Sequence, residues 1–489
     1  MKKVMLTKSD FLNFLECPAY LWLSKHRRDL LPSKTLAVEE ILKMGQGVDN
    51  LARQLFPGGT EVSGYNEDGY KNTVQAMDSR VGVLFQATAV ARGILSARAD
   101  ILTRNAKIGG WDMHEVKMGT SVKPANIYDV AFQRICFEEA GIPIGRTYLV
   151  HVNNKFIRHG KIRVDKFFVS EDVTETVLEK LEETKELIKM ALNTAELKSA
   201  PDLRILVGCE NPKTCDYIKV YCDAFPRTHD AAKKLDTKKL LEYLNLKILD
   251  WRKIPKELVK KIGFHEEKPF KKVDKLLARK EFKKLKYPLY FFDYETYGSA
   301  IPPFDGYRPY QAIPFQYSLL VREKPGEPVR SMEFLARESI DPVPALLASL
   351  KKNLGVKGSI IVWNASFETG RNEEMAKMYP KYSAFLKNLN KRIFDLMLIF
   401  KFQRGIYTNS EFEKSASLKK VLPVICPELS YSSLEIQEGG EASASWPILT
   451  SEKVSLEEKE KLFQNMLKYC KRDTEAMVCI LDKVLKEIQ

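Results

Sequence analysis

Three residues in the first half of the chain have the types and the spacing of a site that hydrolyses phosphate esters. Asp100 precedes a short turn, and Glu115 and Lys117 follow it, two residues apart. Alternate residues of a strand point to the same face, so a strand here would project Glu115 and Lys117 together. The two carboxylates could bind Mg²⁺ or Mn²⁺ through oxygen. The lysine could orient the attacking water and stabilise negative charge on the phosphate.

A second set of acidic residues begins after residue 287. Asp293 and Glu295 again lie two apart in a strand-like run, and Glu368 follows another such run. Near the end of the chain, Tyr469 and Asp473 lie four apart, which places them on one face of a helix. Four carboxylates and a tyrosine are what a two-metal exonuclease needs. One ion activates water, the other stabilises the leaving oxygen, and the tyrosine positions the nucleophile.

Apolar periodicity and turn residues predict the elements that position these side chains. In the first half we expect helices over residues 9–25, 35–56, 125–140 and 170–197, and strands over residues 93–102, 110–118 and 148–152. In the second half we expect strands over residues 289–296, 315–321 and 359–363, with helices dominating afterwards. The expected fold class is therefore α/β.

The first set of residues resembles the active site of the PD-(D/E)XK nucleases, which have a restriction-endonuclease-like fold. The likeness is greatest to the RecB-like and CRISPR-associated adaptation nucleases. It implies that Gln133, in the helix after Lys117, supports the active site. Relatives often carry a metal-binding histidine upstream; here Asp49 could bind metal instead, with Gln46 or neither residue as the alternatives. His114, on the strand face opposite Glu115, is expected to be a packing residue.

Four of the eight cysteines match the iron–sulfur members of this group, which use one cysteine before the catalytic core and three after it. They are Cys17, Cys209, Cys215 and Cys222. The resemblance implies a structural [4Fe–4S] cluster that joins the first helix to the last segment of the domain. A structural Zn²⁺ ion is the alternative. We expect the other cysteines to be ordinary buried residues rather than disulfides: Cys136, Cys426, Cys470 and Cys479.

The second set resembles the DEDD exonucleases of the RNase H-like fold, in the variant whose third motif is Tyr-x-x-x-Asp. Glu368 departs from this pattern, which has aspartate at that place, and glutamate reaches one methylene further. Asp395 is similar to a recurrent Asp-Leu pair and is expected to cap a helix rather than bind metal. The chain as a whole resembles an uncharacterised prokaryotic family that fuses the two kinds of domain.

These resemblances divide the chain into a nuclease domain over residues 1–227, a basic helical linker over residues 228–286 and an exonuclease-like domain over residues 287–489. Residues 252–286 contain fourteen Lys or Arg against five Asp or Glu, and the formal net charge of the chain is +14. A basic balance favours polyanionic partners. No apolar run approaches the roughly 20 residues of a membrane span. The start lacks the features of a signal peptide, so we expect a cytoplasmic protein that binds no membrane.

The sequence thus predicts a metal-dependent nuclease with two active sites, with DNA as the substrate by resemblance. The C-terminal site is expected to be a 3′–5′ exonuclease, and the role could be DNA repair, processing or defence. The alternative is a nucleic-acid-binding protein in which one nuclease fold is an inactive scaffold. Glu368 and the missing histidine near Asp49 favour that alternative. A cluster-dependent redox or sensing protein is a third hypothesis.

Overall fold

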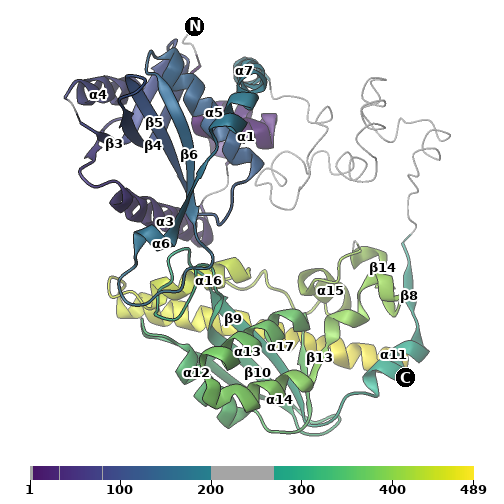
Figure 1. Ribbon diagram of the computed structural model, residues 1–489. Coiled ribbons are helices and arrows are strands. Elements are labelled where there is room, and N and C mark those ends of the chain that lie inside the picture. Colours follow the sequence, from purple (N-terminus) through teal and green to yellow (C-terminus); the bar gives the residue numbers. More distant parts are fainter. Residues whose placement is uncertain (1–3, 32–33, 80, 200–268, 413) are drawn as a thin grey trace, which may run out of the picture. The chain divides into compact units, whose positions relative to one another are not determined.

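The computed structural model describes residues 4–31, 34–79, 81–199, 269–412 and 414–489 (Figure 1). These residues form two compact units. The first contains the described parts of residues 1–33, 43–156 and 161–266, and the second those of residues 34–42, 157–160 and 267–489. Each unit contains a mixed sheet with helices, which confirms the expected α/β class. No helix in the described part of the chain is long and apolar enough to cross a membrane.

The first unit is built on a seven-stranded sheet with the order β2-β3-β4-β5-β6-β7, and β1 pairs in parallel with β4. The pairs β2–β3 and β5–β6 are parallel, and the other neighbours are antiparallel. The strands are β1 (Leu6–Thr7), β2 (Thr60–Glu61), β3 (Val83–Ala91), β4 (Leu95–Asn105), β5 (Gly110–Lys117), β6 (Ile144–Val152) and β7 (Phe168–Asp172).

One face of this sheet packs against α5, because strands β3 and β4 present small side chains there. Ala87, Ala89, Ala97 and Ala99 lie in one core with Phe132 of α5. The helices of the unit are α1 (Lys8–Glu16), α2 (Pro18–His26), α4 (Asn66–Asp78), α5 (Pro124–Glu139), α6 (Val164–Phe167), α7 (Thr174–Glu196) and, from residue 43 onward, α3 (Leu36–Ala52). The unit also has two short 3₁₀ helices, η1 (Arg28–Leu30) and η2 (Arg53–Leu55).

The second unit is built on a five-stranded sheet with the order β11-β10-β9-β12-β13. Strand β10 is antiparallel to both neighbours, whereas β9, β12 and β13 are parallel. The strands are β9 (Leu289–Tyr297), β10 (Ile313–Arg322), β11 (Arg330–Leu335), β12 (Ser359–Val362) and β13 (Ile393–Asp395). A separate two-stranded ladder joins β8 (Lys271–Val273) to β14 (Tyr407–Asn409).

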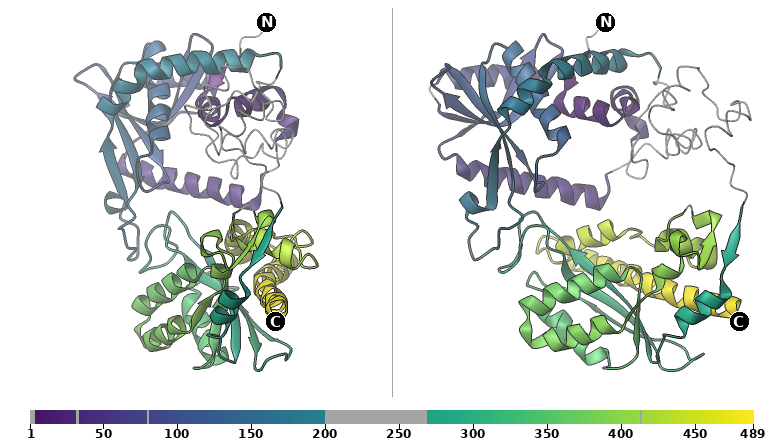
Figure 2. Two further views of the ribbon diagram at one scale, coloured as in Figure 1. Left: turned by 90° about the vertical axis from the view of Figure 1, so that its right-hand side faces the viewer. Right: turned by 45° about the vertical axis from the view of Figure 1, so that its right-hand side comes forward.

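Helices cover both faces of the second sheet (Figure 2). Helices α12 (Val343–Asn353), α13 (Ala365–Met378) and α14 (Ser383–Lys391) pack on one face. Helices α11 (Lys275–Phe282), α15 (Leu418–Ile425) and α17 (Leu456–Ile488) pack on the other, and α16 (Gly439–Leu449) covers its end. The described part of the unit also has short 3₁₀ helices, η6 (Pro380–Tyr382), η7 (Leu396–Ile399), η8 (Phe402–Arg404) and η9 (Ser410–Phe412).

The predicted elements differ from the structure where a local signal was misread. The helix expected over residues 9–25 is two helices, because Cys17 before Pro18 is extended. The segment expected to be one helix over residues 170–197 begins inside strand β7. Eight of the described strands were not predicted, and the longest of them are β3 and β11. The described end of the expected linker, residues 269–286, belongs to the second unit, where Ala278 and Phe282 lie in the core.

Candidate functional site

Asp100 lies at a break in the regular alternation of strands β3 and β4. The backbone of Gln86, opposite Asp100, has a φ of +57°, in the left-handed region that non-glycine residues rarely adopt. Leu84 and Ala87 enter the same core although they are three residues apart on β3. The break leaves the Asp100 carboxylate beside strand β5, where its Oδ2 accepts a 2.9 Å hydrogen bond from the backbone N–H of Val116.

The Glu115 carboxylate is the centre of a buried polar network. Its Oε1 accepts hydrogen bonds from Lys117 Nζ at 2.6 Å and from Lys8 Nζ at 2.8 Å. Its Oε2 accepts one from Gln133 Nε2 at 2.8 Å. The side chain of Glu115 is only 2% exposed. The structure therefore brings Glu115, Lys117 and Gln133 together. The period of two along the strand predicted the first two, and the resemblance implied Gln133.

Two members of this network were not predicted from the sequence. Asp129 accepts hydrogen bonds from Lys117 Nζ at 2.5 Å and from Gln133 Nε2 at 2.9 Å. It lies four residues before Gln133 on α5, so helical spacing could have identified it. Lys8 begins α1 and reaches Glu115 from 107 residues away in sequence. No local pattern could have indicated that contact.

The charges of this first site nearly compensate one another. Burial alone would raise the pKa of Glu115, but Lys117 and Lys8 outweigh it and hold that pKa well below its ordinary range. Burial would lower the pKa of Lys8, yet Glu115 and Asp129 raise it above its ordinary value. Asp100 differs, because burial and the Glu115 charge raise its pKa to about 7 against the opposing effect of the lysines.

Asp49, on α3, lies beside this network. Gln86 Nε2 donates to Asp49 Oδ2 and to Asp100 Oδ1, at 3.4 Å in both cases. Arg53 also pairs with Asp49 Oδ2, at 2.9 Å. The other oxygen, Oδ1, is buried and has no hydrogen-bond partner among the described residues. A buried carboxylate oxygen without a partner fits a metal ligand.

His114 is a packing residue, as expected. Its ring stacks on Tyr148 with centroids 4.7 Å apart, and Phe56 contacts it at the same distance. Burial lowers the pKa of His114 to about 4, so the ring is neutral at physiological pH. Cys17, the first expected cluster ligand, lies between α1 and α2. The other three, Cys209, Cys215 and Cys222, lie outside the described residues.

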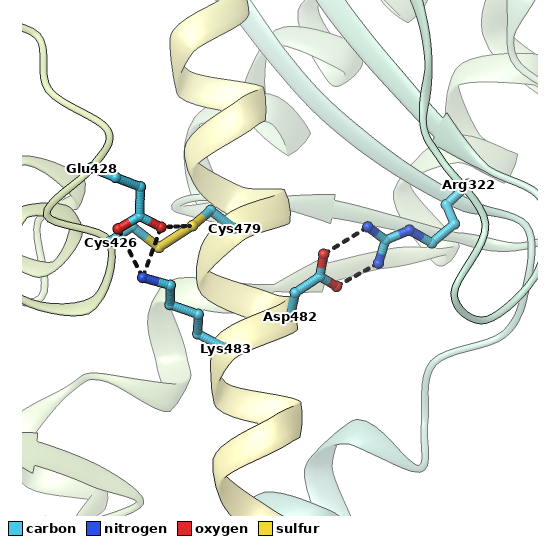
Figure 3. Close-up of a disulfide and its surroundings, with 6 residues drawn as sticks. All are labelled: Arg322, Cys426, Glu428, Cys479, Asp482 and Lys483. Carbon is cyan, nitrogen blue, oxygen red and sulfur yellow. Dashed lines mark hydrogen bonds and ion pairs between the residues drawn. A yellow bond between two sulfur atoms is a disulfide. The ribbon is translucent and has the colours of Figure 1, made fainter.

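In the second unit, helix α17 carries two of the predicted residues against the sheet. Buried polar contacts fix its position along β10. Ser318 and Thr474 share a 2.8 Å hydroxyl hydrogen bond, and Gln316 Nε2 donates to the Met466 carbonyl oxygen at 2.9 Å. At the other end, Arg322 pairs with Asp482 through two hydrogen bonds of 2.5 and 2.7 Å (Figure 3). These contacts set the register of Tyr469 and Asp473 on the helix.

Asp293 and Glu295 point from β9 toward α17, where the thiol of Cys470 lies close to both carboxylates. The ligand atoms of Asp293, Glu295 and Cys470 all lie within 4.8 Å of one another. Cys470 Sγ lies 3.7 Å from Asp293 Oδ2. Cys470 is buried as expected, but its contact with the acidic residues was not predicted. The signal was its place beside Tyr469 in the helix, one residue before the Lys-Arg-Asp run.

Glu368 lies in the first turn of α13 and is 1% exposed. Its Oε2 has no hydrogen-bond partner in the described part of the chain. Burial raises its pKa to about 8, and the charge of Asp395 adds to this effect. Asp395 itself caps η7 through Met397 and also accepts from the backbone N–H of Asn364. Asp395 is thus a cap, as expected.

The carboxylates of the second site have nearby cations but form no direct ion pairs with described residues. No ion pair with a described residue involves any of them: Asp293, Glu295, Glu368 and Asp473. Burial and the charges of Asp473, Glu295 and Glu368 raise the pKa of Asp293 well above its ordinary value. Burial and Asp473 do the same for Glu295. Burial raises the pKa of Asp473 to about 6, although Tyr431, Lys419 and Arg472 oppose it.

Two tyrosines lie beside these acids. Burial and the charge of Asp473 raise the pKa of Tyr469 far above its ordinary value, so its phenol keeps its proton. Tyr431, which was not predicted, donates a hydrogen bond to Asp473 Oδ1. The start of α16 also approaches, since a Cβ at Gly439 would lie 3.8 Å from the Tyr469 hydroxyl and 4.0 Å from Glu295 Oε2.

The two sites fit a divalent cation to different degrees. In the second site, several carboxylates gather with an unpaired oxygen and without lysine partners, a donor set suited to Mg²⁺ or Mn²⁺. In the first site, Asp49 offers an unpaired oxygen, but both oxygens of Glu115 already accept hydrogen bonds. A cation there would have to share Glu115 with these hydrogen-bond donors.

One prediction about the cysteines was wrong. Cys426, at the end of α15, and Cys479, on α17, form a disulfide across 53 residues of sequence (Figure 3). They are isolated in the sequence, but the packing of α15 on α17 brings them together. Glu428 and Lys483 form an ion pair beside the disulfide, at 2.7 Å.

Comparisons with known proteins found one family model and several relatives of this chain. A model described as a domain of unknown function, DUF2779, matches residues 290–417, which include Asp293, Glu295 and Glu368. The uncharacterized protein MG366 of Mycoplasma genitalium is 28% identical over 213 residues, which are 40% of this chain and 32% of that protein. Its Mycoplasma pneumoniae homolog is 27% identical over 218 residues, 41% of this chain and 32% of that protein. The chain thus matches about a third of the length of these relatives.

Proposed function

We propose that this protein is a metal-dependent nuclease with two active sites that hydrolyse phosphodiester bonds in DNA. The observation that carries the proposal is the cluster of four carboxylates in the second unit, of which Glu295 and Glu368 are buried and Asp293 and Asp473 are half-buried. Buried like charges without ion pairs destabilise a fold unless a cation compensates them. A pair of divalent ions would supply that charge, and carboxylates from two strands and two helices are a natural cage for them.

In the second site, Asp293, Glu295, Glu368 and Asp473 would hold the ions. When bound, the ions would supply activation of water and stabilisation of the leaving oxygen. The protonated phenol of Tyr469 is suited to donate a hydrogen bond to the nucleophile or to a phosphate oxygen. Tyr431 would keep Asp473 oriented and ionised, because its hydrogen bond lowers the pKa of that carboxyl.

In the first site, Asp49, Asp100 and Glu115 would hold a single ion. Lys117 and Lys8 keep their protons, because the surrounding acids raise their pKa values against the effect of burial. Either ammonium group could therefore stabilise negative charge on a phosphate. Gln133 would orient both Glu115 and Asp129.

Finer features of the fold belong to the same proposal. The strand order β11-β10-β9-β12-β13, with β10 antiparallel, supports an RNase H-like assignment for the second unit. A Glu-x-Lys strand beside Asp100 supports a PD-(D/E)XK assignment for the first. We also propose that Cys17 and the three later cysteines, Cys209, Cys215 and Cys222, bind a structural [4Fe–4S] cluster. Iron and zinc analysis of the purified protein would distinguish a [4Fe–4S] cluster from a structural Zn²⁺ ion.

The test is cleavage of end-labelled single-stranded and duplex DNA with Mg²⁺ or Mn²⁺. Asp100→Asn and Asp293→Asn keep the side-chain shape. Each substitution should lower the cleavage rate of its own site by at least about 100-fold. Exposed carboxylates provide controls, Asp78→Asn in the first unit and Glu333→Gln in the second. Cleavage that persists in both active-site variants would refute the proposal.

A second candidate function is a nuclease with one working site, in which the first unit only binds DNA. The observation that favours it is the occupation of both Glu115 oxygens by Lys8, Lys117 and Gln133. This candidate predicts that Asp100→Asn changes no cleavage rate. It also predicts salt-sensitive DNA binding by the chain.

A further inference from the structure

A polar pocket of about 280 Å³ opens beside Asp100 in the first unit. Its walls come from the start of α1, the start of α4 and strands β3 and β4. Its lining includes Lys8, Tyr65, Gln86, Thr88, Arg98 and Asp100. Lys8, Gln86 and Asp100 belong to the site described above, whereas Tyr65, Thr88 and Arg98 have no part in it.

The pocket combines a flat aromatic surface with an uncompensated cation. The guanidinium of Arg98 lies 4.5 Å from the ring centroid of Tyr65, and Tyr65 is 69% exposed. Among the residues that the structure describes, the Arg98 guanidinium forms no ion pair and no hydrogen bond. A stacked tyrosine and arginine offer a surface for a base, and the free N–H groups offer donors for a phosphate.

A buried hydroxyl inside the pocket also lacks a partner. Thr88, directly opposite Arg98 in the β3–β4 ladder, is 1% exposed. Its backbone N–H donates to the Thr73 hydroxyl, but its own Oγ1 has no hydrogen-bond partner in the described part of the chain. Buried polar groups are nearly always paired, so this oxygen in the pocket wall calls for a buried water molecule.

The size of the pocket limits what can enter. Pockets for drug-sized ligands span about 300–1,000 Å³, so this pocket suits a single monomer unit. A base pair would not fit, and a base inside a duplex keeps its faces covered by its neighbours. An unpaired nucleotide exposes both a base face and a phosphate to the residues present here.

We propose that this pocket binds one unpaired nucleotide of the substrate strand, with the base on Tyr65 and the phosphate toward the cationic groups of Arg98 and Lys8. The first site would then cut strands that have a single-stranded end or segment. This inference rests on the proposed nuclease function of the first unit.

The test uses the full chain in an Asp293→Asn background, so that cleavage comes from the first site. Substrates are a labelled single-stranded oligonucleotide and the matching blunt duplex, with binding measured in EDTA by fluorescence anisotropy. Base stacking contributes about 1–3 kcal/mol, so Tyr65→Ala should weaken single-strand binding at least about fivefold and raise KM more than it lowers kcat. Tyr65→Phe should restore both.

Arg98→Ala has a matched control in the same strand. Arg104 also lies over an aromatic ring, 4.8 Å from the centroid of Trp111, but it lies outside the pocket. Arg98→Ala should weaken binding like Tyr65→Ala, whereas Arg104→Ala should not. If Tyr65→Ala and Arg98→Ala behave like Arg104→Ala while the parent still cleaves, the pocket inference fails and the nuclease proposal stands. If the parent neither binds nor cleaves DNA, the nuclease proposal itself fails.

Discussion

The buried carboxylates of the first unit have lysine partners, whereas those of the second unit have none among the described residues. Glu115 shares two lysines with Asp129, and its pKa falls below the ordinary range. Glu368 has no ion pair, and its pKa rises to about 8. The first site thus contains its own ion-pair partners, whereas under the proposed function a bound cation would supply the missing charge in the second. The same residue type therefore stabilises one unit and destabilises the other.

The sharpest way to test this contrast is to neutralise Glu115. Glu115→Gln removes the buried carboxylate that two half-buried lysines share, although Asp129 still pairs with both. Removing one partner of a buried pair costs about 3–5 kcal/mol, and we expect the lower end of that range. We expect that loss in urea unfolding of the first unit. Glu186→Gln, which breaks the exposed ion pair with Lys189, should cost no more than about 0.5 kcal/mol. Equal effects of the two substitutions would contradict the comparison.

Metal binding should stabilise the second unit, and more strongly at high pH. A ligand at 100 times its Kd adds about 2.7 kcal/mol. A carboxyl whose pKa is raised on folding contributes stability that is full below its unfolded pKa and is lost as the pH rises through the folded pKa. With the values of about 6 for Asp473 and about 8 for Glu368, the metal-free Tm should fall between pH 5 and pH 8.

Calorimetry with and without Mn²⁺ at both pH values measures this effect. Mn²⁺ should raise the Tm of the second unit more at pH 8, where the carboxylates are ionised, than at pH 5. Asp293→Asn should remove most of the increase. A rise in Tm that is larger at pH 5 would contradict the prediction.

Neutralising Glu368 should stabilise the metal-free protein. Glu368→Gln removes a buried group that resists ionisation, so we expect a gain of about 1–3 kcal/mol at pH 8 together with a loss of second-site cleavage. Glu457→Gln, another glutamate in the first turn of a helix but exposed, should change neither. If Glu368→Gln destabilised the metal-free protein, the ionised Glu368 carboxylate would have to be stabilised by a cationic partner that the structure does not show.

The smallest expected effect concerns Tyr431. Tyr431→Phe removes the hydrogen bond to Asp473, which should cost about 1 kcal/mol. Because that bond lowers the pKa of Asp473, the acidic limb of the second-site pH profile should move upward from its position near pH 6. Tyr382→Phe, also in the second unit, is the control and should leave the profile in place. An unshifted limb in Tyr431→Phe would mean that Asp473 does not limit the acidic side.

Sequence patterns went furthest where the contacts are local. The period of two along β5 placed Glu115 beside Lys117, and helical spacing placed Tyr469 and Asp473 on one face of α17. Patterns failed where the backbone leaves its regular course. Neither the left-handed Gln86 nor the break at Asp100 has a sequence signal, and Pro18 was read through as helix although it begins a new one.

The sequence by itself determined the α/β class, the positions of the acidic residues on their strands and helices, and the basic balance of the chain. Only the tertiary structure decided which charges meet. Lys8 reaches Glu115 across 107 residues, and Cys426 reaches Cys479 across 53. The physical reason is that periodicity fixes the direction of a side chain relative to its own element. Charge compensation depends on atoms that other elements bring within a few ångströms, and no local pattern encodes those distances.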